Sequence, residues 1–385
     1  MAKETMKKPT SRKSAAHHSS ASGTPSTRRK GGKKRSTKKK KKRGMIIAIE
    51  VLLILVVLIG FYVVSKLDQL QHPDMGEGDT AVNEGIEEDT VATMSGYTTV
   101  ALFGLDTRES GQLGKGNRSD TIIIASINND TGEVRLASVF RDTYLDMTTG
   151  KFNKANSAYS TGGPEQAITM LNKNLDMDIT DYVTVDFNAV VECVDLLGGV
   201  TIPEVSDEEA VLMHGYMDEI NKLTKNNSKY LSGGGTNVEM DGVQACAYAR
   251  IRYTTGDDYK RTERQRTVLT AMVQKAQKAN LTTINSLIDE LFGDIKTSFS
   301  NTELISLAAK VFNYSLGETI GFPFEKNTTT LGNKGSVVVP CDLESNVKQL
   351  HVFLYDDNEY APTDTVKNNS AQIVNDTGFH QGEGY

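Results

Sequence analysis

The stretches DTIIIASIN (residues 120–128) and EVRLASVF (residues 133–140) decide the fold. Each is a short apolar run, which is typical of a buried strand. The sequence NNDTGE (residues 128–133) joins them and carries Asn, Asp and Gly, the residues that favour a tight turn. The two runs are therefore predicted to form a β-hairpin.

Further strands and helices follow outward from this hairpin. TTVALFGLD (residues 98–106) precedes it as a buried strand, and DYVTVDF, VTIPE, TIGFPF and SVVVP follow it as later strands. Apolar residues at helical spacing predict helices between them, at residues 162–175, 187–199, 241–250, 261–279, 281–291, 301–314 and 343–354. Strands that alternate with helices predict an α/β layered domain.

The N-terminal region differs sharply from this domain. Residues 1–44 carry 17 Lys and Arg and one acid, so they hold a charge of +16, and the rest of the chain holds −22. This basic segment has almost no apolar content and is predicted to be a disordered tail. Residues 45–66 begin with a twenty-residue stretch in which Glu50 is the only charge. At about 30 Å of helix, this stretch matches the hydrocarbon core of a bilayer. A cleaved signal peptide is the competing interpretation, but the apolar run is longer than such peptides carry.

Charge bias predicts the topology and the boundaries that follow. Basic residues crowd the N-terminal flank of the span, so the tail is expected in the cytoplasm and the rest outside, in a single-pass protein of the cell membrane. Residues 67–95 are acidic and rich in Gly, and we expect a solvated stalk. The catalytic domain is expected at residues 96–365, with its core at 97–275, and a flexible C-terminus at 366–385.

Cysteine and histidine usage excludes several classes of protein. Three cysteines are too few for a disulfide framework and lack metal-ligand spacing. With only six histidines as well, the sequence disfavours a His/Cys zinc site. No Gly-x-Ser-x-Gly elbow and no Walker loop is present. Zinc enzymes, serine hydrolases and P-loop enzymes are therefore disfavoured.

Arginine and aspartate gather where predicted strands begin or end. The segments are FGLDTRE, NRSDT, FRDT, YARIRY and GDDYKRTERQR. Guanidinium groups bind phosphate oxygens bidentately, and a pair of carboxylates among them suits Mg²⁺. Taken singly, each arginine is more often a surface residue or half of an ion pair. The grouping at successive strand ends favours a site for a metal–diphosphate ligand.

These segments closely resemble the LytR-CpsA-Psr family of cell-wall polymer ligases. The resemblance runs in order from about residue 97 to 275, through FGLDTRE, NRSDTIIIASIN, EVRLASVFRDTYLDM, KFNKANSAYSTGGPEQAI, DYVTVDFNAVVECVDLLGGV and DGVQACAYARIRYTTGDDYKRTERQRTVL. It implies a mixed central β-sheet flanked by helices. It also implies transfer of a polyprenyl-diphosphate-linked glycopolymer, such as a teichoic acid or capsule, to peptidoglycan in a Gram-positive-type envelope.

The resemblance also implies roles for individual residues. Asp106 and Asp120 match the acids that hold Mg²⁺, for which Mn²⁺ is an alternative. The residues that match the diphosphate-binding positions are Arg118, Arg141, Arg250, Arg252, Arg261 and Gln265. Asp258 matches an acidic position beside the site, and with Asp106, Asp120 and Arg141 it completes the implied catalytic set.

Two features stay open at the level of sequence. Phe140 stands where the family usually has Pro, so the aim of Arg141 is less fixed. Asn153 and Asn156 match a polar motif near the site, but loop and cap hydrogen bonding explains them equally well.

The lipid needs an apolar slot, and the helical residues that could flank one, or could simply pack on the sheet, are Ile168, Leu171, Val190, Val191, Val194 and Leu197.

Three functions remain in competition. The first is the Mg²⁺-dependent phosphotransferase. The second is a polyprenyl-phosphate-binding envelope scaffold or regulator with little turnover, for which Phe140 leaves room. The third, a nucleic-acid-binding regulator, rests only on the Lys-rich tail, and nothing in that tail supplies a base-reading fold. Binding of the tail to anionic lipid headgroups is favoured instead, so no nucleic-acid partner is expected.

Overall fold

The computed structural model describes residues 80–107, 112–252, 257–291 and 294–385. The predicted basic tail (1–44) and membrane span (45–66) lie outside this range, as does the first part of the predicted stalk. Within the described residues, no helix combines the length and the apolar character needed to cross a bilayer.

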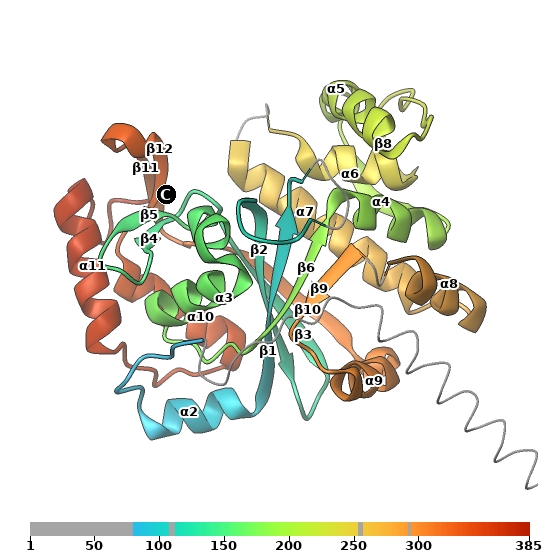
Figure 1. Ribbon diagram of the computed structural model, residues 1–385. Coiled ribbons are helices and arrows are strands. Elements are labelled where there is room, and N and C mark those ends of the chain that lie inside the picture. Colours follow the sequence, from blue (N-terminus) through green and yellow to red (C-terminus); the bar gives the residue numbers. More distant parts are fainter. Residues whose placement is uncertain (1–79, 108–111, 253–256, 292–293) are drawn as a thin grey trace, which may run out of the picture. The chain divides into compact units, whose positions relative to one another are not determined.

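A mixed six-stranded sheet forms the centre of the domain (Figure 1). Its strand order is β10-β3-β2-β1-β6-β9. The predicted hairpin is confirmed, because β2 and β3 pair antiparallel, as β1 and β2 do. β6 runs parallel to β1 and β10 runs parallel to β3, while β9 closes the other edge antiparallel to β6. The strands are β1 (Tyr97–Leu105), β2 (Ser119–Asn128), β3 (Glu133–Val139), β6 (Asp181–Asp186), β9 (Ile295–Thr297) and β10 (Ser315–Phe322).

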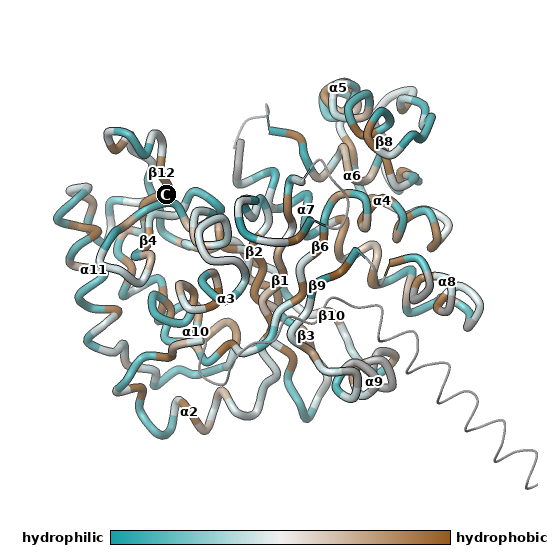
Figure 2. The backbone as a smooth tube through the Cα atoms, in the orientation of Figure 1, coloured by the Kyte–Doolittle hydropathy of each residue, from teal (hydrophilic) through white to brown (hydrophobic). Residues whose placement is uncertain are grey.

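Both faces of the sheet are buried, because the apolar runs of β1 and β2 send alternate side chains to opposite faces. Ile122 and Ile124 belong to the main core, under α3 (Asn156–Leu175) and α10 (Leu343–Tyr355). Ile123 belongs to a small cluster on the opposite face, together with Leu269 of α7 (Asp257–Ala276). Figure 2 shows the hydrophobic residues concentrated along these central strands.

A second core lies beside the sheet and joins helices to a two-stranded ribbon. Its apolar side chains are typically valines and methionines, such as Val194, Val200 and Met213. The elements are α4 (Phe187–Leu196), β7 (Val200–Val205), α5 (Asp207–Thr224), β8 (Gly235–Met240) and α6 (Gly242–Arg250), with α7 packed against them. Sequence analysis did not anticipate α5, which begins with a full capping box between Ser206 and Glu209.

Smaller elements complete the fold. They are α2 (Glu88–Ser95), β4 (Tyr144–Asp146), β5 (Phe152–Lys154), α8 (Leu281–Leu291), α9 (Asn301–Lys310), η2 (Val311–Asn313), β11 (Lys326–Thr330), η3 (Gly332–Lys334), β12 (Ser336–Pro340) and α11 (Asp364–Thr377). β4 pairs with β5 and β11 pairs with β12, each antiparallel. Cys193, Cys246 and Cys341 are free thiols, as the low cysteine count indicates.

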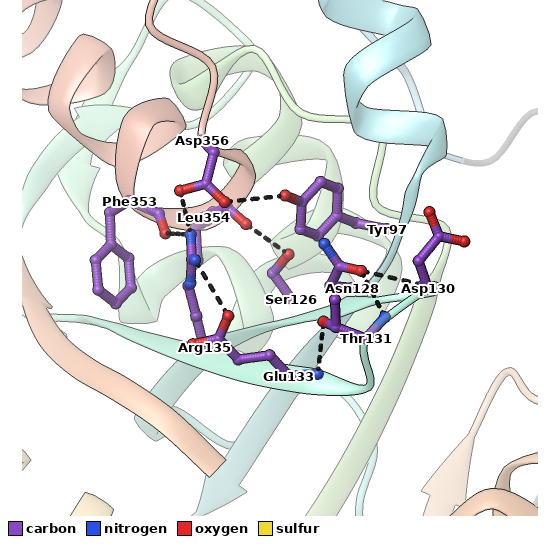
Figure 3. A network of polar contacts seen from close by, with 10 residues as sticks. All are labelled: Tyr97, Ser126, Asn128, Asp130, Thr131, Glu133, Arg135, Phe353, Leu354 and Asp356. Carbon is purple, nitrogen blue, oxygen red and sulfur yellow. Dashed lines mark hydrogen bonds and ion pairs between the residues drawn. The ribbon is translucent and has the colours of Figure 1, made fainter. Parts of the chain in front are cut away.

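A polar network fastens the hairpin to α10 at the turn end of β2 and β3 (Figure 3). Arg135 donates from Nη1 to the Asp356 carboxylate at 2.8 Å and to the Phe353 carbonyl oxygen at 3.0 Å. Tyr97 donates its hydroxyl to the same carboxylate, and Asn128 Oδ1 accepts two backbone N–H groups in the turn. These bonds hold the end of the hairpin at which the strands reverse.

Two terminal segments are more ordered than the sequence suggests. Residues 366–385 are expected to be flexible, yet Asp364–Thr377 form α11, with Val366 and Ile373 buried in the main core. The predicted stalk likewise includes α2, whose Met94 is buried. Both segments meet Asp176, which ends α3 in the left-handed conformation and accepts hydrogen bonds from Asn83 and Thr363. Each helix is polar overall and is held by a few apolar anchors and by these bonds, which a composition argument overlooks.

Candidate functional site

A cavity of about 430 Å³ opens between the sheet and the helices α4, α6 and α7. Its walls are largely apolar. The apolar and thiol side chains that line it are Leu102, Phe103, Ile123, Val183, Val185, Phe187, Ala189, Val190, Cys193, Cys246, Ala249, Val268, Leu269, Met272, Leu291 and Ile295. Burial raises the pKa of the Cys193 thiol to about 11 and that of Cys246 to about 12, so both act here as apolar wall. We call this space the lipid cavity.

Charged side chains from several segments line the same cavity. They are Asp106, Asp120, Asp186, Arg250, Arg252 and Arg261, and the uncharged Gln265 lines the cavity beside them. β1 ends at Leu105 and β2 begins at Ser119, so Asp106 and Asp120 lie on neighbouring strands. Gly104 keeps this edge tight, because a Cβ there would lie 2.9 Å from the Cβ of Thr121. The residues predicted from strand ends therefore come together at one cavity, except for those discussed below.

Asp120 is the centre of an arginine cluster. Its Oδ1 accepts from Nη1 of Arg141 at 2.8 Å, and its Oδ2 accepts from Nη2 of Arg252 at 2.9 Å. Nη1 of Arg261 lies 4.0 Å from the same Oδ2. Three guanidinium groups therefore converge on one carboxylate. The Asp120 side chain is only 13% exposed, so this carboxylate is largely enclosed. Such a cluster brings several phosphate-binding groups to one point.

Arg250 ends α6 and reaches Asp106 from the opposite side of the cavity mouth. Its Nη2 lies 3.8 Å from the Asp106 carboxylate and 3.2 Å from that of Glu219. The guanidinium stacks over the Phe187 ring at 4.6 Å, and Nη1 is buried without a hydrogen bond among the described residues. Burial raises the pKa of Asp106, the charges of Asp120 and Glu219 raise it further, and Arg250 opposes this. Asp106 therefore accepts a proton more readily than an ordinary aspartate.

The remaining predicted positions on α7 divide in two. Arg261 is almost fully buried and Gln265 lines the cavity, so one turn of α7 presents both to the mouth. Asp258 also belongs to α7, but its side chain lies outside the described part of the structure. Between Arg261 and Gln265 in the sequence, Arg264 donates from Nε to Glu209 of α5 at 2.7 Å. This buried pair fixes the helix that carries Arg261 and Gln265.

Some predicted residues lie elsewhere. Arg118 precedes β2, is exposed and lines a second, polar cavity together with Asn153. Asn156 is buried at the start of α3. Among the residues proposed to flank a lipid slot, only Val190 lines the cavity, whereas Ile168 and Leu171 are in the main core and Val191 and Val194 are in the second core. Those positions serve packing, which is the more common role of an apolar helix face.

Phe140 proves compatible with the placement of Arg141. Its ring packs edge to face on Tyr259 of α7 at 4.6 Å, and Nζ of Lys326 lies 5.5 Å from its centre. The ring also fills the space beside Gly321, where an added Cβ would lie 2.6 Å from Cζ. Phe140 thus links the end of β3 to α7, and Arg141 still reaches Asp120.

Asp106 and Asp120 suit a divalent ion that arrives with phosphates. Mg²⁺ in phosphate-transfer sites is held by one or two carboxylates and by substrate phosphate oxygens. Burial is the main cause of the raised pKa of Asp106, and the charge of Asp120 adds to it; a cation would relieve the repulsion between these two carboxylates. Both Asp120 oxygens already accept from arginines, so the protein alone offers few free ligands. Within the described residues, no group of three or more His, Cys, Asp or Glu could hold a metal.

Four residues of the site were not anticipated from sequence. Glu219 and Tyr216 come from α5 and flank Arg250. Phe187 supports the Arg250 guanidinium, and Asp186 lines the cavity while capping α4 through a bond from the Ala189 N–H at 2.9 Å. Asp186 and Phe187 stand at the end of a predicted strand, which is the pattern from which Asp106 was predicted. No sequence pattern indicates Glu219 and Tyr216, because nothing local connects α5 to the cavity mouth.

Comparison with known proteins agrees with this geometry. The LytR_cpsA_psr family model matches residues 69–334. A relative in Enterococcus faecalis, the polyisoprenyl-teichoic acid–peptidoglycan teichoic acid transferase TagU, is 32% identical over 54% of this chain and 64% of its own length. The TagU of Halalkalibacterium halodurans is 28% identical over 63% of this chain and 74% of its own. The match to the first relative thus spans less than two thirds of that protein.

Solved structures share the fold. The structure of TagT bound to LIIa-WTA superposes with a TM-score of 0.53 at 20% identity, over 80% of this chain and all of that one. At this identity the likeness concerns the fold, which has the mixed sheet and flanking helices seen here. The family model covers more than half of the chain and includes every charged residue of the cavity mouth. The chain therefore belongs to the LytR_cpsA_psr family.

Proposed function

We propose that this protein is a phosphotransferase that moves a polyprenyl-diphosphate-linked glycopolymer onto peptidoglycan and releases polyprenyl phosphate. The observation that carries the proposal is the two-part cavity, with apolar walls inside and arginines at its mouth. A polyprenyl diphosphate has the same two parts, an apolar chain and a head with several negative charges. The family relationship and the transferase names of the relatives support the same reaction.

The arginines are proposed to bind the diphosphate. Arg141, Arg252 and Arg261 surround Asp120, and Arg250 holds Asp106 from the other side. A diphosphate at the mouth would accept from these guanidiniums in place of the single carboxylate oxygens they now contact. Phosphoryl transfer depends mainly on positioning and on neutralising charge, which planar guanidinium forks supply. Gln265 adds a neutral donor at the same mouth.

Asp106 is proposed to take the proton of the acceptor hydroxyl. It lines the cavity mouth, and burial and neighbouring acids raise the pKa of its carboxyl. A raised pKa brings a carboxylate closer to the range in which a general base works well. Asp106 and Asp120 are the residues that would hold Mg²⁺ alongside substrate phosphates, and the ion would supply further charge neutralisation. Mn²⁺ has similar ligand preferences and is a second candidate.

The chain is proposed to act at the outer face of the cell membrane. The apolar run at residues 45–66 follows a basic segment, and a substrate with a polyprenyl tail is itself held in a membrane. Protease added to intact, wall-stripped cells is then expected to digest the domain and to spare residues 1–44. Digestion of that basic tail from outside would contradict the orientation.

Covalent transfer is the direct test of the proposed reaction. The full-length protein is incubated with a polyprenyl-diphosphate-linked glycan, uncross-linked peptidoglycan strands and Mg²⁺, and the strands are then examined for attached glycan. We expect attachment in the wild type and none in an Arg252→Ala variant. Retained binding of the lipid with no transfer under any metal condition would instead favour the scaffold or regulator.

A further inference from the structure

A second cavity, of about 1170 Å³, lies among β4, β5, η3 and α11. Arg118, Lys151, Lys154 and Lys334 line it, and the lining includes one acid, Asp376. The Asp376 carboxylate accepts from the Tyr144 hydroxyl at 2.9 Å and from Gln372 at 2.7 Å. The cavity therefore carries an excess of positive charge. We call it the polar groove.

Side chains suited to carbohydrate line the polar groove between these charges. Phe152, which is partly exposed, packs on the buried Tyr144 with ring centres 5.6 Å apart, and Nζ of Lys334 lies 5.6 Å from the Tyr144 ring. Amides and hydroxyls complete the lining: Asn153, Asn333, Asn368, Asn369, Gln372, Thr149, Ser157 and Thr161. Amides donate to and accept from sugar hydroxyls, and aromatic faces pack against pyranose rings and acetamido methyl groups. The lining thus suits a glycan that carries negative charge.

A chain of ion pairs connects the polar groove to the cavity mouth. Lys154 in the groove lies 3.4 Å from Oδ1 of Asp142, and Nε of Arg141 lies 3.9 Å from the same oxygen. Arg141 in turn bonds Asp120 at the mouth of the lipid cavity. Lys154, which lines the groove, is therefore linked through Asp142 and Arg141 to Asp120, which lines the lipid cavity.

In-line displacement assigns the two sides. The attacking oxygen and the leaving oxygen lie on opposite sides of the transferred phosphorus. Under the proposed function, the leaving polyprenyl phosphate belongs on the side of the lipid cavity. The acceptor hydroxyl then approaches from the side away from the lipid cavity, and the polar groove is the cavity linked to Asp120 through Lys154, Asp142 and Arg141.

We propose that the polar groove binds the acceptor, a peptidoglycan strand whose stem-peptide carboxylates meet its lysines. This proposal rests on the proposed function and deepens it, because it names the acceptor's binding surface. Part of that surface is outside the range of the family match, since α11 begins at Asp364 and the match ends at residue 334. The ordered C-terminal helix therefore gains a role as one wall of the acceptor site.

The test measures strand binding without any lipid donor, so that its outcome does not depend on transfer. Fluorescent, uncross-linked peptidoglycan strands are titrated into the full-length protein, its Lys151→Glu/Lys334→Glu variant and a control variant, Lys278→Glu/Lys310→Glu. The control carries the same charge change at two exposed positions, one just after α7 and one at the end of α9. Melting temperatures establish that each variant is folded.

We expect the groove variant to bind strands at least about tenfold more weakly, since charge-assisted contacts typically contribute that much. The control should bind as the wild type does, and polyprenyl phosphate should raise the melting temperature of all three proteins. Equal strand binding by the groove variant would overturn the proposal. So would loss of binding to a poly(glycerol phosphate) chain alone, because the groove would then serve the donor polymer. Loss of lipid stabilisation in the wild type would instead count against the proposed function.

Discussion

Asp120 and Asp176 are both enclosed aspartates with several hydrogen-bond donors, yet their surroundings differ. Asp176 is fully buried, and its oxygens accept from Asn83, Tyr360 and Thr363, which are all uncharged. Asp120 is partly exposed in a cavity and is met by the guanidiniums of Arg141, Arg252 and Arg261. The first carboxylate joins three segments of the chain. The second gathers three guanidinium groups at a cavity.

The difference shows which buried charge points to a ligand. A carboxylate whose neutral donors are matched one to one contributes to the fold, because losing it would leave those donors unsatisfied. A carboxylate on which several guanidinium groups converge is suited to replacement by an anion of higher charge. The two acids can therefore be separated by experiment, since one should govern activity and the other stability.

The largest expected effect is on activity at Asp120. Asp120→Asn keeps the shape and removes the charge that orders Arg141 and Arg252, so transfer should fall at least about a hundredfold, as for other residues that organise charge in a transition state. The melting temperature should change less than in the Asp176 variant, because water in the cavity can hydrogen-bond to the freed guanidiniums. Transfer at saturating Mg²⁺ is the measurement, and an active Asp120→Asn enzyme would remove this acid from the mechanism.

Asp176→Asn should have the opposite profile. The amide presents N–H groups to donors from Tyr360 and Thr363 and leaves at least one unsatisfied in a site closed to water. A loss of about 3 kcal/mol in unfolding free energy is expected at this order of magnitude. Chemical denaturation measures it, with transfer per folded molecule close to wild type. A variant as stable as the wild type would show that the Asp176 hydrogen bonds do not hold the terminal segments.

Arg→Lys substitutions sharpen the comparison at moderate size. Arg250→Lys or Arg252→Lys keeps the charge but loses the planar fork, and transfer should fall about tenfold. Arg135→Lys is the matched control, because Arg135 contacts Asp356 through Nη1 and Glu133 through Nη2 at the far end of the hairpin. The control should lose stability and keep activity. If Arg250→Lys and Arg252→Lys lose stability but not activity, they are structural ion-pair partners.

The smallest expected effect concerns the histidine beside Asp176. Burial lowers the pKa of His351, whose ring stacks on Tyr360 at 3.7 Å. The unfolded chain takes up a proton near its ordinary pKa of 6.5 while the folded chain resists, so stability should fall as pH drops below that value. The slope can reach about 1.4 kcal/mol per pH unit. Denaturation at pH 7.5 and 5.5 measures it, and His351→Gln should show a shallower slope; an unchanged slope would assign the effect to other groups.

The sequence predicts the sheet well for a physical reason. Strands buried on both faces are continuous apolar runs, so β1, β2 and β3 stand out from their surroundings, and charges at their ends can be placed at one edge. Arg118 was predicted beside the other arginines but lines the polar groove. It precedes β2, where strand alternation no longer fixes side-chain direction. Glu219 was missed because α5 reaches the site only through tertiary packing. The helix α11 was missed because its anchors, Val366 and Ile373, are sparse within a polar segment.

The central claim is that the lipid cavity receives a polyprenyl diphosphate, and ligand-induced stabilisation tests it most directly. Melting temperatures are measured with and without polyprenyl diphosphate for the full-length wild type, for Val190→Trp and for Val211→Trp. Val190 lines the cavity, whereas Val211 is exposed on α5. At a ligand concentration a hundredfold above Kd, binding should add about 2.7 kcal/mol of stability. The account predicts this gain in the wild type and in Val211→Trp, and its loss in Val190→Trp, whose indole fills the cavity. An equal gain in all three proteins would contradict it.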